Sequence, residues 1–215
     1  MYNVRDLGGL PTTGGGVTRW GALVRSEGLD RLASDGWAAL HAYGIRTCID
    51  LRSGFETAER PYAVGAPGVV RVPAAWEEGL LDDLVFRDWT GRGLLSCALY
   101  YEPFLERWPE RTAATVRAVS AAGPGGVLYH CQRGRERTGL LTLLLLSLVG
   151  VPDEVIVADQ VHTDDRLRSH GIALGHERAS RARPTSTPST ERPPRRPSRL
   201  CSPASTSPST YATQG

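Results

Sequence analysis

A histidine, a cysteine, three arginines and two glycines lie within the twelve residues 128–139, LYHCQRGRERTG. The cysteine, Cys131, ends a short apolar run, and a long apolar segment follows the second glycine. A loop that leads into a helix presents unpaired backbone N–H groups and the positive end of the helix dipole. Gly134 lets the backbone curl so that those N–H groups converge on one anion. We therefore expect Cys131 to lie at the edge of an anion site, where N–H and guanidinium groups stabilise a thiolate.

Arg137 follows Cys131 by six residues and can offer a planar pair of donors to two phosphate oxygens. A nucleophile, an oxyanion site and a bidentate cation around one pocket indicate a phosphomonoester hydrolase. Such an enzyme would work through a cysteinyl-phosphate intermediate.

The pattern H-C-x5-R-T-G, with Gly134 in register, resembles the signature loop of the protein-tyrosine phosphatase superfamily. Four further blocks resemble one bacterial branch, which contains tyrosine/serine and phosphoinositide phosphatases. These blocks are NVRDLGG (3–9), RSEGL (25–29), GIRTCIDLRS (44–53) with Glu56, and VPDEVIVADQ (151–160). The resemblance covers roughly residues 3–168.

The resemblance implies a role for each matching position. Cys131 would be the nucleophile and Arg137 the phosphate clamp. Thr138 would assist the cysteine as leaving group when the phosphoenzyme breaks down, and His130 would order the surroundings of the cysteine. With His130, the other positions of the motif would form the substrate-binding set: Gln132, Arg133, Gly134, Arg135 and Gly139.

The general acid is less defined, because the chain departs from the branch's loop, H-C-x-A-G-K-D-R-T-G. Arg133 replaces the alanine, and Arg135-Glu136 replaces Lys-Asp. Glu136 is our candidate acid, since a carboxyl there could reach the leaving group; alternatively, it pairs with Arg133 or Arg135. Rival carboxyls follow the expected strand 69–75, on a lid: Glu77, Glu78, Asp82, Asp83 and Asp88.

The substrate class follows from the same residues. A phosphotyrosine protein is the first expectation, with phosphoserine/threonine or a phosphoinositide as alternatives. Arg133 and Arg135 would favour a polyanionic headgroup, but all 25 basic residues of the chain are arginine, so a single arginine carries less weight. A phosphate-binding pseudophosphatase is the alternative function. A sulfurtransferase or arsenate-reducing relative would share a cysteine loop but not the whole motif.

Charged residues outside the loop are expected to be structural. Asp50, Arg52 and Glu56 would brace the loop through ion pairs. Arg5 and Asp6 would form a salt-linked turn near the site.

Helical and strand-like segments alternate along the chain. We expect short β-prone pieces at 17–20 and 22–25, strands at 45–53, 69–75 and 126–130, and helices at 33–44 (capped by Ser34), 137–150 and 153–168. Residues 88–122 have a helical pattern that breaks near Trp108, which precedes a proline. This order predicts an α/β sandwich of three layers, with a mainly parallel sheet flanked by helices.

Composition limits the remaining function classes. Residues 1–175 hold 18 arginines against 21 acidic residues, so charge makes no case for nucleic acid. The cysteines 48, 97, 131 and 201 lack metal-ligand spacing, and we expect neither a metal site nor a cofactor. The N-terminus lacks a signal-peptide pattern, and the apolar run 140–150 is too short to span a bilayer. We expect a cytoplasmic protein without stable membrane insertion; its oligomeric state stays open.

The composition changes sharply near residue 175. Residues 176–215 are rich in Pro, Ser, Thr and Arg, with 7 arginines and 2 glutamates. We expect a phosphatase domain over 1–175, C-terminally incomplete, and a disordered tail over 176–215. An out-of-frame reading of further helical sequence would explain such a tail.

Overall fold

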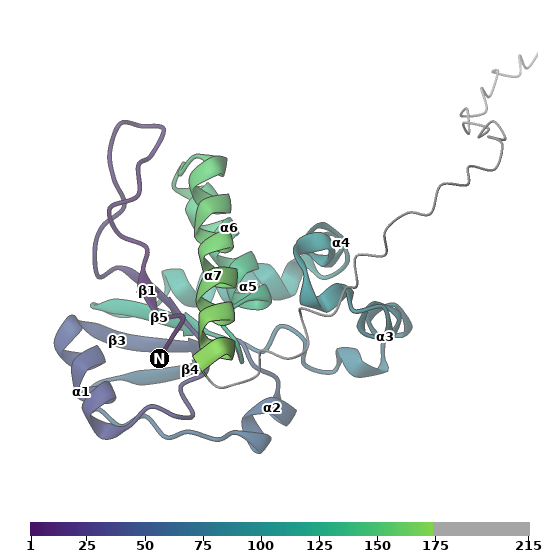
Figure 1. The fold of residues 1–215 in the computed structure, drawn as a ribbon, viewed down its shortest axis with the longest axis horizontal. Helices are drawn as coiled ribbons and strands as arrows, with labels where there is room; N and C mark the ends of the chain where they lie inside the picture. Colours follow the sequence, from purple (N-terminus) through teal and green to yellow (C-terminus); the bar gives the residue numbers. More distant parts are fainter. Residues whose placement is uncertain (174–215) are drawn as a thin grey trace, which may run out of the picture. The chain divides into compact units, whose positions relative to one another are not determined.

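A five-stranded sheet with the order β1-β2-β5-β3-β4 forms the centre of the fold. The computed structural model describes residues 1–173. The strands are β1 (Arg5–Asp6), β2 (Leu23–Ser26), β3 (Ile45–Asp50), β4 (Val70–Pro73) and β5 (Gly126–His130). Only β1 is antiparallel to its neighbour; the other three pairings are parallel. The predicted α/β class with a mainly parallel sheet is confirmed (Figure 1).

The helices lie on both sides of this sheet. They are α1 (Ser34–Tyr43), α2 (Gly54–Glu59), η1 (Leu80–Asp82), α3 (Leu84–Gly91), η2 (Leu94–Ser96), η3 (Ala98–Tyr100), α4 (Tyr101–Arg107), α5 (Pro109–Ser120), α6 (Glu136–Leu148) and α7 (Asp153–Ala173). Figure 1 shows α1 on one side of the strands and α5, α6 and α7 on the other.

Alternating side chains of the central strand build two cores. Val127 and Tyr129 pack with Leu140 and Leu141 of α6, whereas Leu128 packs with a second group that includes Trp37 of α1. Successive strand residues point to opposite faces, so β5, buried at all five residues, contributes to both layers.

Several element boundaries differ from expectation. The segment after β3 is helical rather than a loop from Gly54 on, because Ser53 and Glu56 form a capping box. Ser34 does not cap α1; Ala33 holds the cap position without a side-chain bond. The helical pattern of 88–122 begins earlier, at Leu84, and is broken near Gly93 and Cys97 as well as at Trp108.

The last described helix is longer than predicted. α7 runs from Asp153 to Ala173 and packs against α6. The predicted disordered tail at 176–215, the domain boundary and the out-of-frame reading lie outside the described residues. Within residues 1–173, no helix combines the length and the hydropathy that a bilayer-spanning segment needs.

The packing of α6 gives a stability prediction. Leu141 is fully buried, whereas Leu148 on the same helix is 70% exposed. Leu141→Ala removes buried methyl groups and leaves a cavity, so urea denaturation should show a loss of about 2–5 kcal/mol in the free energy of unfolding. Leu148→Ala, the matched control, should change it by no more than about 0.5 kcal/mol. Equal losses in the two variants would contradict this packing.

Candidate active site

The segment 131–136, the 131–136 loop from here on, connects the end of β5 to the start of α6. Gly134 adopts φ 65°, and a Cβ atom there would lie 2.4 Å from the Ser26 carbonyl oxygen. Both the left-handed backbone and the close approach to β2 therefore require glycine. The predicted sequence of strand, tight loop and helix is confirmed.

All six carbonyl groups of the 131–136 loop accept hydrogen bonds from donors outside it. In chain order the donors are His130 Nδ1, Gly28 N–H, Asn3 Nδ2, Asn3 Nδ2 together with Arg25 Nη2, Gly139 N–H and the Tyr101 hydroxyl. Within residues 1–173, no group accepts a hydrogen bond from the N–H groups of residues 132–135. These N–H groups, and those of the first turn of α6, are available to an anion.

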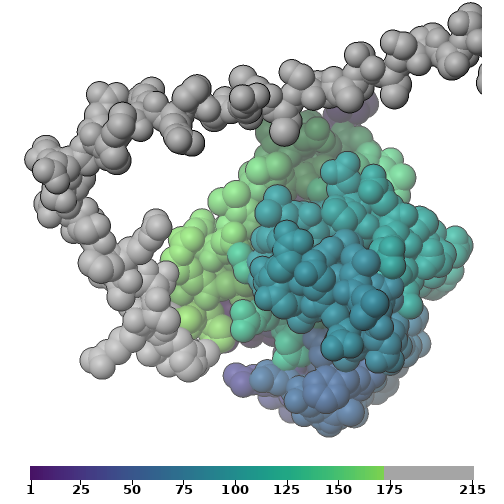
Figure 2. Space-filling view, turned by 90° about the vertical axis from the view of Figure 1, so that its right-hand side faces the viewer, coloured from purple at the N-terminus to yellow at the C-terminus, as the bar shows by residue number. Residues whose placement is uncertain are grey.

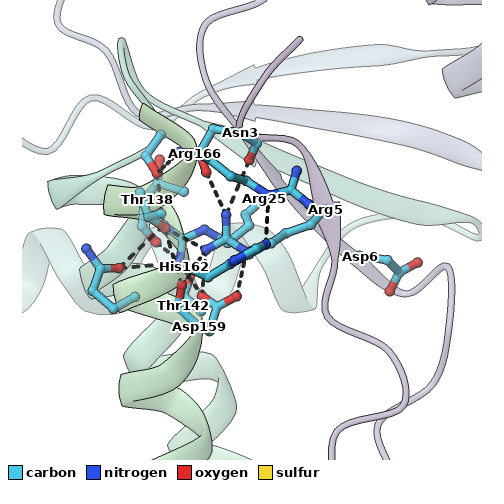
Figure 3. A network of polar contacts seen from close by, with 12 residues as sticks. Asn3, Arg5, Asp6, Arg25, Thr138, Thr142, Asp159, His162 and Arg166 are labelled. Atoms are coloured by element: carbon cyan, nitrogen blue, oxygen red, sulfur yellow. Dashed lines mark hydrogen bonds and ion pairs between the residues drawn. The ribbon is translucent and has the colours of Figure 1, made fainter. Parts of the chain in front are cut away.

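A buried network of ion pairs and hydrogen bonds contacts the backbone of the 131–136 loop (Figure 3). Arg25 is fully buried and donates through Nη2 to the Gly134 carbonyl at 2.8 Å. Its Nη1 lies 2.5 Å from Asp159, and Arg5 binds the same carboxylate at 2.6 and 2.9 Å. Burial raises the pKa of Asp159, but the hydrogen bond from Arg5 and the charge of Arg25 outweigh it, so the pKa is lowered.

The expected salt link between Arg5 and Asp6 is wrong. Arg5 turns toward α7 and pairs with Asp159. Asp6 instead accepts hydrogen bonds from the N–H groups of Gly8 and Gly21 and from the Tyr43 hydroxyl. Neighbouring residues of a strand point to opposite faces, which separates the two side chains.

Arg137 is held by Glu56 in a bidentate pair. Arg137 Nη1 and Nη2 lie 2.5 and 2.6 Å from the two carboxylate oxygens. Burial disfavours the charge of Arg137, but the bond to Glu56 and the proximity of Cys131, Glu77 and Glu56 outweigh it and raise the pKa. Among residues 1–173 nothing accepts from Nε, so the edge formed by Nε and the outer hydrogen of Nη2 can bind an anion. Glu56 therefore braces the loop, as expected.

His130 is buried and neutral. Its Nδ1 lies 3.1 Å from the Cys131 carbonyl oxygen, which can only accept, so Nδ1 donates. Nε2 then accepts from the Tyr62 hydroxyl at 2.8 Å. Burial lowers the pKa of His130 to about 4, although the nearby Asp50 carboxylate opposes this shift. Asp50 itself is paired with Arg52 and Arg71, each at 2.8–2.9 Å.

Cys131 and Thr138 are both buried. Cys131, the first residue after β5, is 2% exposed. The Thr138 hydroxyl is buried, and it has no hydrogen-bond partner within the described part of the chain. Buried polar groups normally have a partner, so this hydroxyl is a spare donor in the first turn of α6.

The carboxyl groups near the loop occupy different positions. Glu136 pairs with Arg135 at 3.1 Å, which is one of the two alternatives expected for it. Glu77 lies 3.4 Å from Arg137. The other four rivals are engaged or exposed: Glu78 accepts from Gly54 N–H, Asp83 caps α3, Asp88 pairs with Arg92, and Asp82 is exposed.

The remaining predicted substrate-binding residues lie in two environments. Gln132 and Arg133 line a surface cleft beside the loop, together with Arg135. Gly139 lies inside α6, where a Cβ atom would meet the Tyr101 hydroxyl and the Gln160 side chain at 2.6 and 2.5 Å. Gln160 belongs to α7, so Gly139 packs closely against that helix. The role of Gly139 as a substrate contact stays a prediction.

Sequence reasoning missed the residues that orient the loop from a distance: Asn3, Arg25, Tyr62 and Asp159. Three of them lie within blocks that resemble the bacterial branch, which was the available signal. Nothing in the spacing of Tyr62 indicates its contact with His130.

Sequence comparisons with known proteins indicate a tyrosine phosphatase. A sequence model described as the tyrosine phosphatase family matches residues 1–207. A Cupriavidus necator protein whose name places it among the tyrosine-protein phosphatases is 32% identical over 77% of this chain and 62% of its own. The triple specificity protein phosphatase PtpB of Mycobacterium tuberculosis is 30% identical over 77% of this chain and 68% of its own. A tyrosine-protein phosphatase of Nostoc commune is 31% identical over 63% of this chain and 46% of its own.

The buried His130 predicts a pH-dependent stability. Unfolding returns its pKa from about 4 to the ordinary value of 6.5, so the unfolded chain binds more protons between these values. The free energy of unfolding should therefore fall as the pH drops from 6.5 to 4, by up to about 3 kcal/mol from this residue. Urea denaturation at half-unit pH steps measures the slope.

His130→Asn keeps a donor for the Cys131 carbonyl but cannot titrate. The variant should lose this part of the slope and retain the part due to the depressed carboxyls of Asp50, Glu56 and Asp159, whose contribution is lost at still lower pH. Identical slopes in variant and parent would show that His130 is not a buried neutral imidazole.

Proposed function

The chain belongs to the tyrosine phosphatase family, and we propose that it hydrolyses phosphomonoesters through a cysteinyl-phosphate intermediate. One observation carries the proposal: every carbonyl of the 131–136 loop accepts a hydrogen bond from a donor outside the loop, and within residues 1–173 the N–H groups of residues 132–135, which follow Cys131, have no acceptor. Fixed donors around a developing charge stabilise a transition state without reorganisation. The chain matches 62% of the length of the Cupriavidus relative and 68% of the length of the Mycobacterium relative. We therefore propose its activity from its own site.

The proposed reaction has two steps. The N–H groups of the loop and the free edge of Arg137 bind the nonbridging phosphate oxygens, and the Cys131 thiolate attacks phosphorus opposite the leaving oxygen. The P–O bond to the leaving group breaks as that oxygen takes a proton. Water then attacks the phosphocysteine, the S–P bond breaks, and the Thr138 hydroxyl stabilises the departing thiolate. The proton donor is Glu136 or Glu77.

A phosphate-binding pseudophosphatase is the second candidate. Its site would need the N–H groups and Arg137 but neither a nucleophile nor the spare hydroxyl. The presence of Cys131 and of the unpartnered Thr138 hydroxyl beside the same loop favours the enzyme.

A phosphotyrosine protein is the first proposed substrate. Figure 2 shows a hollow between the lobe formed by α3 and α4 and the segment that includes α2. Cys131 is almost fully buried, so a long, rigid phosphotyrosine side chain reaches it more readily than a short phosphoserine.

A phosphoinositide is the second proposed substrate, because a basic cleft adjoins the loop. The cleft has a volume of about 840 Å³, and its lining includes Arg31, Arg60 and Arg133. These three side chains are exposed and form no ion pair within residues 1–173. Additional phosphate groups on an inositol headgroup would form ion pairs with these three arginines. Among the relatives, PtpB is named a triple specificity phosphatase.

Cysteine-dependent hydrolysis is the first test of this function. The purified chain should hydrolyse dinitrophenyl phosphate, whose leaving group needs no proton. Cys131→Ser should lower kcat by more than about 1,000-fold, because it removes the nucleophile. Arg137→Lys should lower kcat/KM by about 100-fold, since an ammonium cannot form the bidentate contact.

Trapping complements these rates. Acid quenching with radiolabelled substrate should capture label on the parent chain but not on Cys131→Ser. Phosphate binding without any turnover would contradict the enzyme and support the pseudophosphatase.

The cleft gives a separate prediction about substrate class. Arg31→Gln/Arg60→Gln should raise KM for a soluble phosphoinositide by about 5-fold or more, from the loss of two exposed cations. KM for dinitrophenyl phosphate should stay within about 2-fold. Arg19→Gln, an exposed arginine outside the cleft, is the matched control. Equal effects on both substrates, or turnover of a phosphotyrosine peptide alone, would exclude the phosphoinositide.

A further inference from the structure

We infer that Glu77, on the segment after β4, is the general acid that protonates the leaving oxygen. The inference rests on the proposed phosphatase function and assigns its proton donor. It selects between Glu77 and Glu136, the two proposed proton donors.

Glu77 is brought to the site by topology. β3, β4 and β5 are parallel, so the segments that follow them meet at one edge of the sheet. Glu56 follows β3, the 131–136 loop follows β5, and Glu77 follows β4. The Glu77 carboxylate lies 3.4 Å from Nη1 of Arg137, the guanidinium that would grip the phosphate.

The backbone on both sides of Glu77 is anchored. Arg111 of α5 donates to the carbonyls of Trp76 and Glu78 at 3.0 and 2.7 Å. Trp76 is buried against Phe104, and its indole N–H donates to Thr115. The Glu78 carboxylate accepts from Gly54 N–H at the start of α2. Glu77 is thus presented by a fixed segment, and its position does not require a lid to close.

The other two carboxyl groups near Arg137, those of Glu56 and Glu136, already form close ion pairs. Both oxygens of Glu56 bind Arg137, and one of them also caps α2. Glu136 pairs with Arg135, whose Nε is bound to Asp164. Within residues 1–173, the Glu77 carboxyl accepts no hydrogen bond and has Arg137 as its one ion-pair partner, at a longer distance than the Glu56 pair.

The surroundings of Glu77 favour its protonated form. Burial raises the pKa of Glu77, and the charges of Glu56 and Glu136 raise it further, against the opposing effect of Arg137. The pKa of Tyr100 is also raised, by burial and by the charge of Glu77, so this hydroxyl is neutral and adds no charge. A bound phosphate would add negative charge beside the carboxyl and favour the proton again.

The proton balance of the cycle is then complete. As the P–O bond breaks, the Glu77 carboxyl gives its proton to the leaving oxygen, which departs as an alcohol or phenol. The resulting carboxylate accepts a proton from the water that attacks the phosphocysteine. Phosphate leaves, and the thiolate and the protonated carboxyl are restored.

Leaving-group dependence tests the assignment. Glu77→Gln should lower kcat/KM, which reports only the steps up to departure of the leaving group, by about 100-fold or more for phenyl phosphate, because the phenolate needs a proton. It should lower kcat/KM for dinitrophenyl phosphate by less than about 10-fold, because that leaving group needs none. The alkaline limb of the pH profile of kcat/KM for phenyl phosphate should be absent in the variant. Glu77→Asp should recover part of the phenyl phosphate activity.

Two further variants decide between residues. Glu136→Gln should affect both esters equally, and Asp82→Asn, an exposed carboxylate of the same segment, should affect neither. A leaving-group-dependent loss in Glu136→Gln, or equal losses on both esters in Glu77→Gln, would overturn the assignment. Absence of Cys131-dependent turnover of dinitrophenyl phosphate in the parent chain would instead overturn the proposed function, and the assignment with it.

Discussion

The outward orientation of the carbonyl groups in the 131–136 loop is the constraint on which the rest of the structure depends. A peptide unit whose oxygen points away from the site must point its N–H toward it. The carbonyl oxygens cannot be left without partners in a buried setting, because each would cost about 1–3 kcal/mol. The donors that satisfy them come from β2 and the segment after it, from β5, α4 and α6, and from the N-terminal segment. The anion site is therefore a property of the whole fold.

Buried charge enters the fold through the same constraint. A guanidinium as buried as that of Arg25 requires a carboxylate partner, and Asp159 supplies it from α7. Arg5 also pairs with Asp159, so two guanidinium groups share this carboxylate. The network thus connects the N-terminal segment, which is synthesised first, to α7, the last described helix. The 131–136 loop lies between these two segments in the sequence.

The local part of the site could be predicted from the sequence, and the distant part could not. Cys131, Arg137 and Thr138 lie within eight residues, so the strand–loop–helix pattern was sufficient to place them. Asn3 and Arg25 contact Gly134 across 131 and 109 positions, and no periodicity reports such a contact. Proximity in sequence favoured Glu136 as the acid, whereas the parallel sheet brings Glu77 to Arg137 from another strand. α2 was missed because six residues give too short a pattern, although its capping box is visible in SGFE.

The long separation between Arg5 and Asp159, 154 positions, has a consequence for the nascent chain. A ribosome releases Cys131 before it releases the carboxylate that anchors the buried arginines, so the thiol exists for a time without its anion site. Contacts between residues so far apart in the sequence form late in folding. The chain must first lose the conformational entropy of closing a long loop, and only then does the contact stabilise the fold. Translation products that stop short of α7 would carry the complete sequence motif and still lack a working site.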